Sequence, residues 1–203
     1  MSEQQEWDKR YTEKDLPWDI GYPDGRLMDL VAGWGLNKSG GKVLEVGCGT
    51  GSNALWLAEQ GFQVTAVDIS PAAVALAEER AKEQGLECIF QAEDFLKGCS
   101  LEPKAFNFLF DRGCFHSVGQ AEERRTFARQ AASLLASNGI WFSLIGNKDQ
   151  ATQKKGPPRM SVAEISAAVE EDFEILRLES SWTNPVSKLG PLRFWQCLMR
   201  LRG

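Results

Sequence analysis

The chain is poor in histidine, in closely spaced cysteines and in long apolar runs, and each shortage excludes a class of protein. Its single histidine, His116, has Cys114 nearby, and two ligands are too few for a structural zinc, so no metal site is predicted. The five cysteines are scattered, which is typical of reduced thiols in a cytoplasmic protein. No apolar run reaches membrane-spanning length and no signal-peptide pattern opens the chain, so we expect no membrane partner.

The chain also lacks an excess of positive charge, with 23 Lys and Arg against 28 Asp and Glu. The formal net charge is −5, whereas a protein that binds nucleic acid usually carries a basic surface. The length of 203 residues and the ordinary apolar and charged fractions indicate a globular protein that buries a full core in one domain. Composition therefore favours a small-molecule ligand over a nucleic acid, and a monomer or dimer is expected.

The most informative stretch runs from residue 42 to residue 68. Short apolar runs at 43–46 and 63–67 contain β-branched residues and predict buried strands of a parallel sheet. Apolar residues at helical spacing predict a helix over 52–60, which ends before Gly61. The stretch therefore predicts a strand, a glycine turn, a helix and a second strand.

Glycines at alternate positions and a distant acid make this unit a candidate ligand site. Gly47, Gly49 and Gly51 allow the turn to adopt positive φ and to approach a ligand without side chains in the way. Asp68 follows Gly47 by 21 residues, the spacing at which a βαβ unit presents a carboxylate to a pair of ribose hydroxyls. The alternative is an ordinary tight turn between strand and helix.

Two ligand classes use such a unit. A dinucleotide fingerprint requires glycine or alanine where this chain has Ser52, and Glu45 would repel a pyrophosphate. A cationic ligand with an amino group would instead be attracted by Glu45. An NAD(P)-dependent oxidoreductase is therefore disfavoured but stays an alternative.

The form E-V-G-C-G-T-G followed by V-D-I-S resembles the class I S-adenosylmethionine-dependent methyltransferases. The resemblance implies a loop that cradles the methionine part of the cofactor and an acid that holds its ribose. The residues that it assigns to these two tasks are Glu45, Gly47, Cys48, Gly49, Gly51, Asp68 and Ile69. The expected cofactor is S-adenosyl-L-methionine, with S-adenosyl-L-homocysteine as product.

Residues 91–95 follow the predicted third strand, at an edge where open α/β sheets bind ligands. In the methyltransferases an acid at this place accepts a hydrogen bond from the adenine amine. The resemblance therefore assigns Asp94 to that contact, with Glu93 beside it and Phe95 near the ring. The alternative for Asp94 is a plain helix-capping residue.

Residues 1–35 are dense in aromatic side chains, and 16–23 contain two prolines and a glycine, which predicts a loop. The patterns W-D-x-x-Y and P-W-D-x-G-x-P resemble the N-terminal region of thiopurine- and thiol-type methyltransferases. That resemblance implies a lid in which Trp18 closes over the cofactor and excludes water. The alternative is a hydrophobic cover without a role in binding.

The fourth predicted strand ends in Asp111-Arg112-Gly113, which resembles the thiopurine methyltransferases. The resemblance implies, for Arg112 alone, a contact with the methyl acceptor. Asp111 is a candidate cofactor-binding residue, and with Arg112 and His116 it is expected to border the acceptor. His116 has two interpretations: a base that takes a proton from a thiol or amine, or a structural histidine bonded to a backbone carbonyl. Arg112 and His116 are the candidate catalytic residues.

The remaining pattern completes an α/β prediction. Further strands are expected at 86–90, 105–110, 139–146, 173–182 and 192–201, with helices over 26–34, 71–84, 122–137 and 162–171 and a loop at 147–160. The last two strands follow each other closely, across a turn at 184–185, and predict an antiparallel pair at the sheet edge.

The predicted fold is a Rossmann-like, doubly wound sheet of seven strands with one antiparallel strand. One methyltransferase domain spans 1–203, with a lid at 1–35 and a catalytic core at 42–203. The predicted function is S-adenosylmethionine-dependent transfer of a methyl group to a small molecule, such as a thiol or another chalcogen. A non-catalytic regulator that binds the same cofactor is the other alternative.

Overall fold

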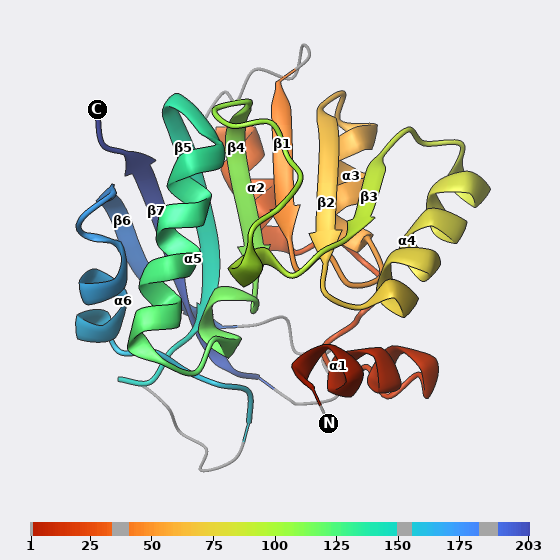
Figure 1. The fold of residues 1–203 in the computed structure, drawn as a ribbon, viewed down its shortest axis with the longest axis horizontal. Coiled ribbons are helices and arrows are strands. Elements are labelled where there is room, and N and C mark those ends of the chain that lie inside the picture. Colours follow the sequence, from red (N-terminus) through yellow and green to blue (C-terminus); the bar gives the residue numbers. More distant parts are fainter. Residues whose placement is uncertain (1, 34–40, 150–155, 183–190) are drawn as a thin grey trace. The chain divides into compact units, whose positions relative to one another are not determined.

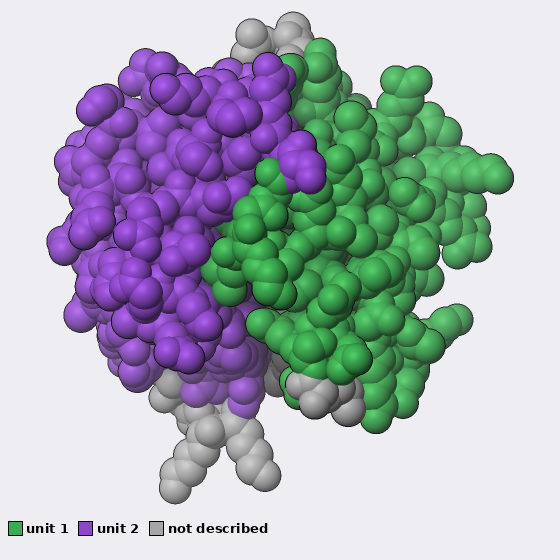
Figure 2. Space-filling model, in the orientation of Figure 1, with its two compact units in different colours: residues 1–99 green, residues 100–203 purple. Residues whose placement is uncertain are grey.

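The computed structural model describes residues 2–33, 41–149, 156–182 and 191–203. The chain divides into two compact units, residues 1–99 and residues 100–203, coloured separately in Figure 2. The predicted fold class is confirmed, because the strands form a seven-stranded mixed sheet with helices between them. Unit 1 contributes three of these strands and unit 2 contributes four.

Unit 1 contains a parallel sheet in the order β3-β2-β1, and Figure 1 shows α1 beyond the carboxyl ends of β1 and β2. Its elements are α1 (Glu3–Thr12), α2 (Gly25–Gly33), β1 (Lys42–Val46), α3 (Ser52–Glu59), β2 (Gln63–Asp68), α4 (Pro71–Gln84), β3 (Ile89–Ala92) and the short 3-10 helix η1 (Phe95–Lys97). The predicted strand-turn-helix-strand unit is confirmed.

Helix α1 is absent from the sequence prediction. Its composition is strongly polar and lacks an apolar stripe, which is the signal by which surface helices are recognised. The overlooked signal is a capping box, in which Ser2 accepts from the Gln5 amide and the Gln5 side chain accepts from the Ser2 amide. We call residues 2–24, which contain α1 and the following loop, the N-terminal segment.

Strand β3 begins three residues later than predicted. Gly85 ends α4 in the left-handed conformation, with φ of 65°. The Leu86 amide then donates to the Ala81 carbonyl at 3.0 Å, so Leu86 still belongs to the helix terminus. The apolar side chain of Leu86 therefore follows the helix cap and lies outside the strand.

Unit 2 contains the strand order β4-β5-β7-β6, in which β7 is antiparallel to both of its neighbours. Its elements are β4 (Phe106–Arg112), the 3-10 helix η2 (Phe115–Ser117), α5 (Ala121–Leu134), β5 (Leu135–Gly146), α6 (Val162–Val169), β6 (Phe173–Trp182) and β7 (Arg193–Leu201). The predicted antiparallel strand is confirmed, and β6 forms the edge beside it.

Strand β5 starts four residues earlier than predicted, directly after α5. Leu135 is fully buried and pairs with Phe106 of β4 before a register shift in the ladder. Part of the predicted 147–160 loop and the turn at 184–185 lie outside the described residues. Within the described part of that loop, Asn147 forms a bridge with Met160.

Candidate functional site

The glycine turn after β1 adopts the backbone geometry predicted for it. Gly47, Gly49 and Gly51 have φ of 71°, 55° and 81°. The amides of Gly47 and Cys48 donate to the Val67 carbonyl at 2.8 and 3.1 Å. These two bonds fix the first part of the turn against the end of β2.

Asp68 lies at the end of β2 with both carboxylate oxygens bonded to backbone amides. Oδ2 accepts from Gly49 at 2.9 Å and Oδ1 accepts from Ser70 at 3.0 Å. Burial raises the pKa of Asp68, while the amides of Ser70, Gly49 and Ile69 act in the opposite direction. The Asp68 carboxylate therefore joins the glycine loop to the residue before α4. Ile69 is the residue between Asp68 and Ser70 in the chain.

Glu45 acts through Asn53 in this structure. Its Oε1 accepts from the Nδ2 amide of Asn53 at 3.0 Å. The side-chain oxygen of Asn53, Oδ1, accepts from the Asp24 backbone amide at 2.8 Å. Glu45 is 1% exposed. This chain of hydrogen bonds connects β1, α3 and the end of the N-terminal segment.

The close neighbours of Gly49 and of Gly51 explain why each position favours a residue without a side chain. A Cβ on Gly49 would lie 2.9 Å from the Tyr11 hydroxyl oxygen, so the side chain of Tyr11 rests against the turn. A Cβ on Gly51 would lie 3.0 Å from the Cβ of Ala77 in α4. Gly49 thus permits the N-terminal segment to approach, whereas Gly51 permits two helices to pack.

Three aromatic side chains of the N-terminal segment form one cluster. Trp18 meets Trp7 and Tyr11 edge to face, with centroid separations of 5.4 and 6.2 Å. The guanidinium of Arg10 lies 4.3 Å from the Trp18 ring centroid, a cation–π geometry. Burial, followed by the charge of Asp68, raises the pKa of Tyr11, so its phenol stays neutral. The segment predicted as a lid therefore packs beside the glycine loop.

Asp8 of α1 completes the N-terminus of α4. One carboxylate oxygen, Oδ1, accepts from the Ser70 hydroxyl at 2.8 Å and from the Ala72 amide at 2.9 Å. Ser70 in turn caps the helix by accepting from the Ala73 amide. A carboxylate is stabilised at a helix N-terminus by unpaired amides and by the helix dipole. These bonds attach α1 to Ser70 and Ala72, which follow Asp68 closely in the chain.

Cys48 and the residues after β3 have defined surroundings in unit 1. Cys48 is buried, and burial raises the pKa of its thiol, so it packs as a neutral side chain. Asp94 caps η1 by accepting from Leu96 and pairs with Lys97, while Phe95 is buried. The Glu93 amide donates to the Asp68 carbonyl at 2.9 Å. The capping alternative for Asp94 is thus observed, and its adenine contact stays a prediction.

In unit 2, Asp111 is directed into the interior. It is fully buried, and its two oxygens accept from the Phe115 amide at 3.0 Å and the Trp141 indole at 2.9 Å. Burial raises its pKa to about 6, against the effect of these donors. Asp111 therefore holds η2 against β5, and its cofactor contact stays a prediction.

His116 of η2 is also buried, at 3% exposure. Its Nδ1 accepts from the Gly146 amide at 2.6 Å, which places the proton of the neutral ring on Nε2. Burial, and then the charges of Arg112 and Arg124, lower its pKa to about 3. The geometry matches the structural interpretation of His116, although its partner is an amide rather than a carbonyl. Arg112 ends β4 and is half-buried.

The residues that sequence reasoning missed lie in the N-terminal segment, α3 and α4. Asp8, Asp19, Asn53 and Arg80 each bond to an element distant in the chain. Charged and amide side chains on polar stretches give no periodic signal. The patterns W-D-x-x-Y and P-W-D-x-G-x-P contain Asp8 and Asp19 but did not indicate their partners. Among the described residues, no group of three or more potential ligands could hold a metal, and no helix is long and apolar enough to cross a membrane.

Comparison with known proteins places these features in a family. The family model described as thiopurine S-methyltransferase matches residues 2–188. A 2-heptyl-1-hydroxyquinolin-4(1H)-one methyltransferase of Mycobacteroides abscessus is 30% identical over 133 residues, 65% of this chain and 56% of that protein. A probable thiol methyltransferase 2 of Arabidopsis thaliana is 29% identical over 162 residues, 78% of this chain and 68% of that protein.

Solved structures agree with this fold over nearly the whole chain. The structure titled "Conversion of a Disulfide Bond into a Thioacetal Group during Echinomycin Biosynthesis" has a TM-score of 0.85 at 24% identity, covering 98% of this chain and 92% of that one. Magnesium protoporphyrin IX methyltransferase from Synechocystis PCC 6803, solved with bound SAM, has a TM-score of 0.74 at 20% identity, covering 100% and 98%. The alignment with the Mycobacteroides protein, by contrast, spans only a little over half of that relative's length.

Proposed function

The chain belongs to the thiopurine S-methyltransferase family, and on this premise we propose that it transfers a methyl group from S-adenosylmethionine to a small-molecule acceptor with a nucleophilic sulfur. The family description names a sulfur acceptor, and the Arabidopsis relative is named a probable thiol methyltransferase. The whole reaction, its acceptor and its cofactor are parts of this proposal.

The observation that carries the cofactor proposal is the bond between Asp68 and Gly49. It brings a buried carboxylate against a turn whose backbone has positive φ and no Cβ at Gly49. Each carboxylate oxygen accepts more than one hydrogen bond, so the ribose hydroxyls and the backbone amides can share Asp68. The donor and acceptor set at this turn therefore fits a nucleoside ligand.

The other predicted site residues of unit 1 are each assigned to one part of the cofactor. Gly47, Cys48, Gly49 and Gly51 form the cradle for the methionine part, and Glu45 fixes it through Asn53. Ile69, Glu93, Asp94 and Phe95 follow β2 and β3 and are assigned to the adenosine part, with Trp18 in the covering segment. The chemistry that S-adenosylmethionine supplies when bound is an activated methyl group on a sulfonium sulfur.

The acceptor side is assigned to Arg112 in unit 2. Its guanidinium is charged at all physiological pH values and favours the thiolate form of a nearby thiol, so the acceptor is presented as the nucleophile. His116 is assigned a supporting role, because its Nδ1 is bonded and its Nε2 carries the proton. The acceptor proton therefore leaves to solvent, without a side-chain base.

Calorimetry tests the cofactor. S-adenosylmethionine and S-adenosylhomocysteine are each titrated into the protein, with NAD as the comparison ligand. We expect both sulfur nucleosides to bind and NAD to give no heat of binding. Tight binding of NAD without a response to either sulfur nucleoside would reject the methyltransferase assignment and favour an oxidoreductase.

A panel of acceptors tests catalysis. Aromatic and aliphatic thiols, selenides, tellurite, amines and carboxylates are incubated with methyl-labelled cofactor, and labelled product is counted. We expect thiols to be methylated fastest. Binding of the cofactor without transfer to any acceptor would favour a regulator, and exclusive transfer to amines or carboxylates would contradict the sulfur acceptor.

We further infer a cytoplasmic enzyme that acts on free small molecules and not on nucleic acid. The acidic net charge and the five free cysteines support this inference. Size-exclusion chromatography with light scattering should give a monomer or a dimer, and added duplex RNA or DNA should leave the elution unchanged.

A further inference from the structure

Arg80 of α4 binds two segments that are distant from it in the chain. One of its terminal nitrogens, Nη1, donates to the Thr50 carbonyl, the Thr50 hydroxyl and the Ser52 hydroxyl at 3.0, 2.8 and 3.0 Å. The other, Nη2, donates to the Gly21 carbonyl at 3.3 Å. A single guanidinium thus touches the glycine loop and the N-terminal segment.

Thr50 continues this contact toward the N-terminal segment. Its hydroxyl accepts from Arg80 and donates to Oδ2 of Asp19 at 2.8 Å. The other oxygen of Asp19, Oδ1, accepts from the Gly21 amide at 2.8 Å. We call these five residues (Arg80, Thr50, Ser52, Asp19 and Gly21) the Arg80 network.

The geometry requires the forked shape of arginine. Its two terminal nitrogens lie on a rigid plane and reach different acceptors, whereas lysine offers a single nitrogen. Hydrogen bonds that involve a charged donor are stronger than neutral ones. The Arg80 network lies at the turn where the proposed cofactor would be cradled, directly after Gly49.

We propose that Arg80 is a positioning residue that holds the glycine loop and residues 19–21 together, and that it thereby sets the rate at which nucleoside product leaves unit 1. This inference rests on the proposed function for the identity of the product. In this proposal the product departs when residues 19–21 separate from the turn, and that separation breaks the bonds of Arg80 to Gly21 and of Thr50 to Asp19.

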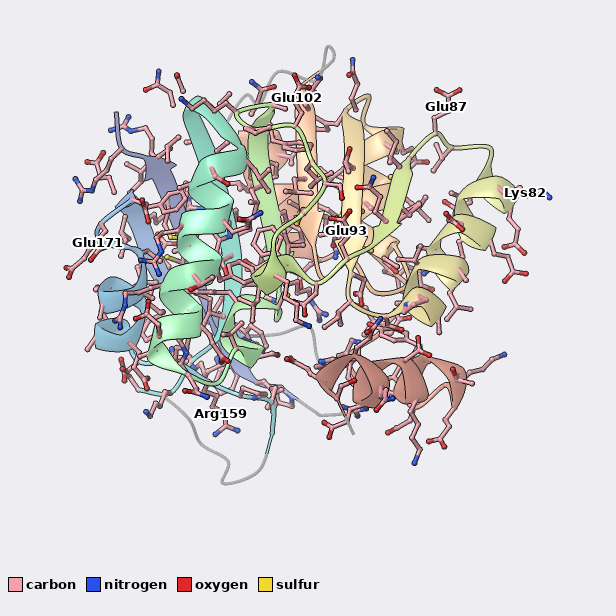
Figure 3. The ribbon with its side chains drawn as sticks, in the orientation of Figure 1. Lys82, Glu87, Glu93, Glu102, Arg159 and Glu171 are labelled. Atoms are coloured by element: carbon pink, nitrogen blue, oxygen red, sulfur yellow. The ribbon has the colours of Figure 1, made fainter. Side chains whose placement is uncertain are left out.

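Four variants separate this role from a general effect on stability. Arg80→Ala removes the whole fork, and Arg80→Lys keeps the charge with one nitrogen. Lys82→Ala is the matched control, since Lys82 is an exposed cation of the same helix and projects outward from α4 in Figure 3. Thr50→Val is a second probe, because it removes the hydroxyl that joins Arg80 to Asp19.

Two measurements are made on the full-length chain. Amide hydrogen exchange of residues 16–24 without ligand reports opening of the segment. Stopped-flow tryptophan fluorescence reports dissociation of S-adenosylhomocysteine. We expect Arg80→Ala and Thr50→Val to exchange and to release product about tenfold faster, the scale of one or two charge-assisted bonds. Arg80→Lys should be intermediate, and Lys82→Ala should match the wild type.

The outcomes are distinguishable. Unchanged exchange and unchanged release in both Arg80→Ala and Thr50→Val would overturn the proposal, as would an equal effect of Lys82→Ala. If Arg80→Ala does not fold, Thr50→Val alone decides. Faster exchange in a protein whose wild type fails to bind S-adenosylhomocysteine would reject the proposed function while leaving the positioning role of Arg80 intact.

Discussion

The Nδ1 atom of His116 accepts a hydrogen bond from the Gly146 amide at 2.6 Å, and this bond joins η2 to the end of β5. It exists only while the imidazole is neutral, because a protonated ring carries hydrogen on both nitrogens. Burial and the charges of Arg112 and Arg124 keep the ring neutral by lowering its pKa to about 3.

The first prediction concerns pH and His116. Below about pH 6.5 the unfolded chain binds a proton at this histidine and the folded chain does not. The free energy of unfolding therefore decreases as the pH is lowered. His116→Asn keeps an acceptor without titrating. Between pH 7 and 4.5 the wild type should lose about 3 kcal/mol more stability than the variant.

Urea unfolding at several pH values makes this measurement. Asp111, whose pKa is raised to about 6, titrates in both proteins. Its protonation raises the free energy of unfolding as pH falls in both, so its effect cancels in the comparison. Parallel pH profiles for the two proteins would show that His116 titrates normally in the folded state.

The second prediction concerns the close approach of Tyr11 to Gly49. Gly49→Ala places a Cβ 2.9 Å from the Tyr11 hydroxyl and strains a left-handed backbone, so unfolding should become easier by about 1–3 kcal/mol. In the Tyr11→Phe background the clashing oxygen is absent, and the loss should shrink to the backbone strain alone. A double-mutant cycle from urea unfolding measures the difference, and strict additivity would contradict the contact.

The third prediction concerns Asp68. Asp68→Ala should weaken binding of S-adenosylhomocysteine by about 1–3 kcal/mol, the scale of hydrogen bonds to a charged group. Glu83→Ala is the control, since Glu83 is an exposed acid of α4 outside the proposed site, and it should bind like the wild type. Calorimetry gives both dissociation constants. An Asp68→Ala variant that folds and binds like the wild type would leave Asp68 with only its backbone role.

The fourth prediction concerns Arg112. Arg112→Ala should reduce turnover of a thiol acceptor at least tenfold, because the guanidinium no longer favours the thiolate, while the dissociation constant of S-adenosylhomocysteine stays within about twofold. The loss should also lessen at higher pH, where the thiol ionises unaided. Arg125→Ala serves as control, since Arg125 lies on the exposed face of α5 and pairs with Glu122. Unchanged turnover in Arg112→Ala would remove it from the acceptor site.

The sequence predicted the strand-turn-helix-strand unit well because its signals are local. Positive φ at Gly47, Gly49 and Gly51 follows from residue type, and the position of Asp68 follows from the lengths of the elements between them. The start of β3 and the start of β5 differ most from the prediction, the first because of a local helix cap and the second because of pairing with a distant strand. The Leu86 amide bonds to Ala81 at the end of α4, and Leu135 pairs with Phe106 of β4.

The side-chain partners were far less predictable. Asp111 lies one residue before the end of β4, in a place typical of ligand contacts, yet its buried carboxylate accepts from the Trp141 indole, thirty residues away. Asp8 bonds to Ser70 across 62 residues, and nothing in either local stretch indicates the other. Such contacts depend on how distant elements pack, which composition and periodicity do not encode.

The position of β7 constrains the order in which unit 2 is made during synthesis. β7 follows β6 in the chain but lies between β5 and β6. Until residues 193–201 have emerged, β5 is therefore paired with β4 alone and β6 has no strand partner in the sheet. At about 5–20 residues per second, roughly 47 residues separate the completion of β5 from the arrival of β7, a wait of about 2 to 10 s. Through that interval the apolar edge of β5, with Phe142, Leu144 and Ile145, is open to wrong partners. Nascent chains stalled before residue 193 should therefore aggregate or bind chaperones.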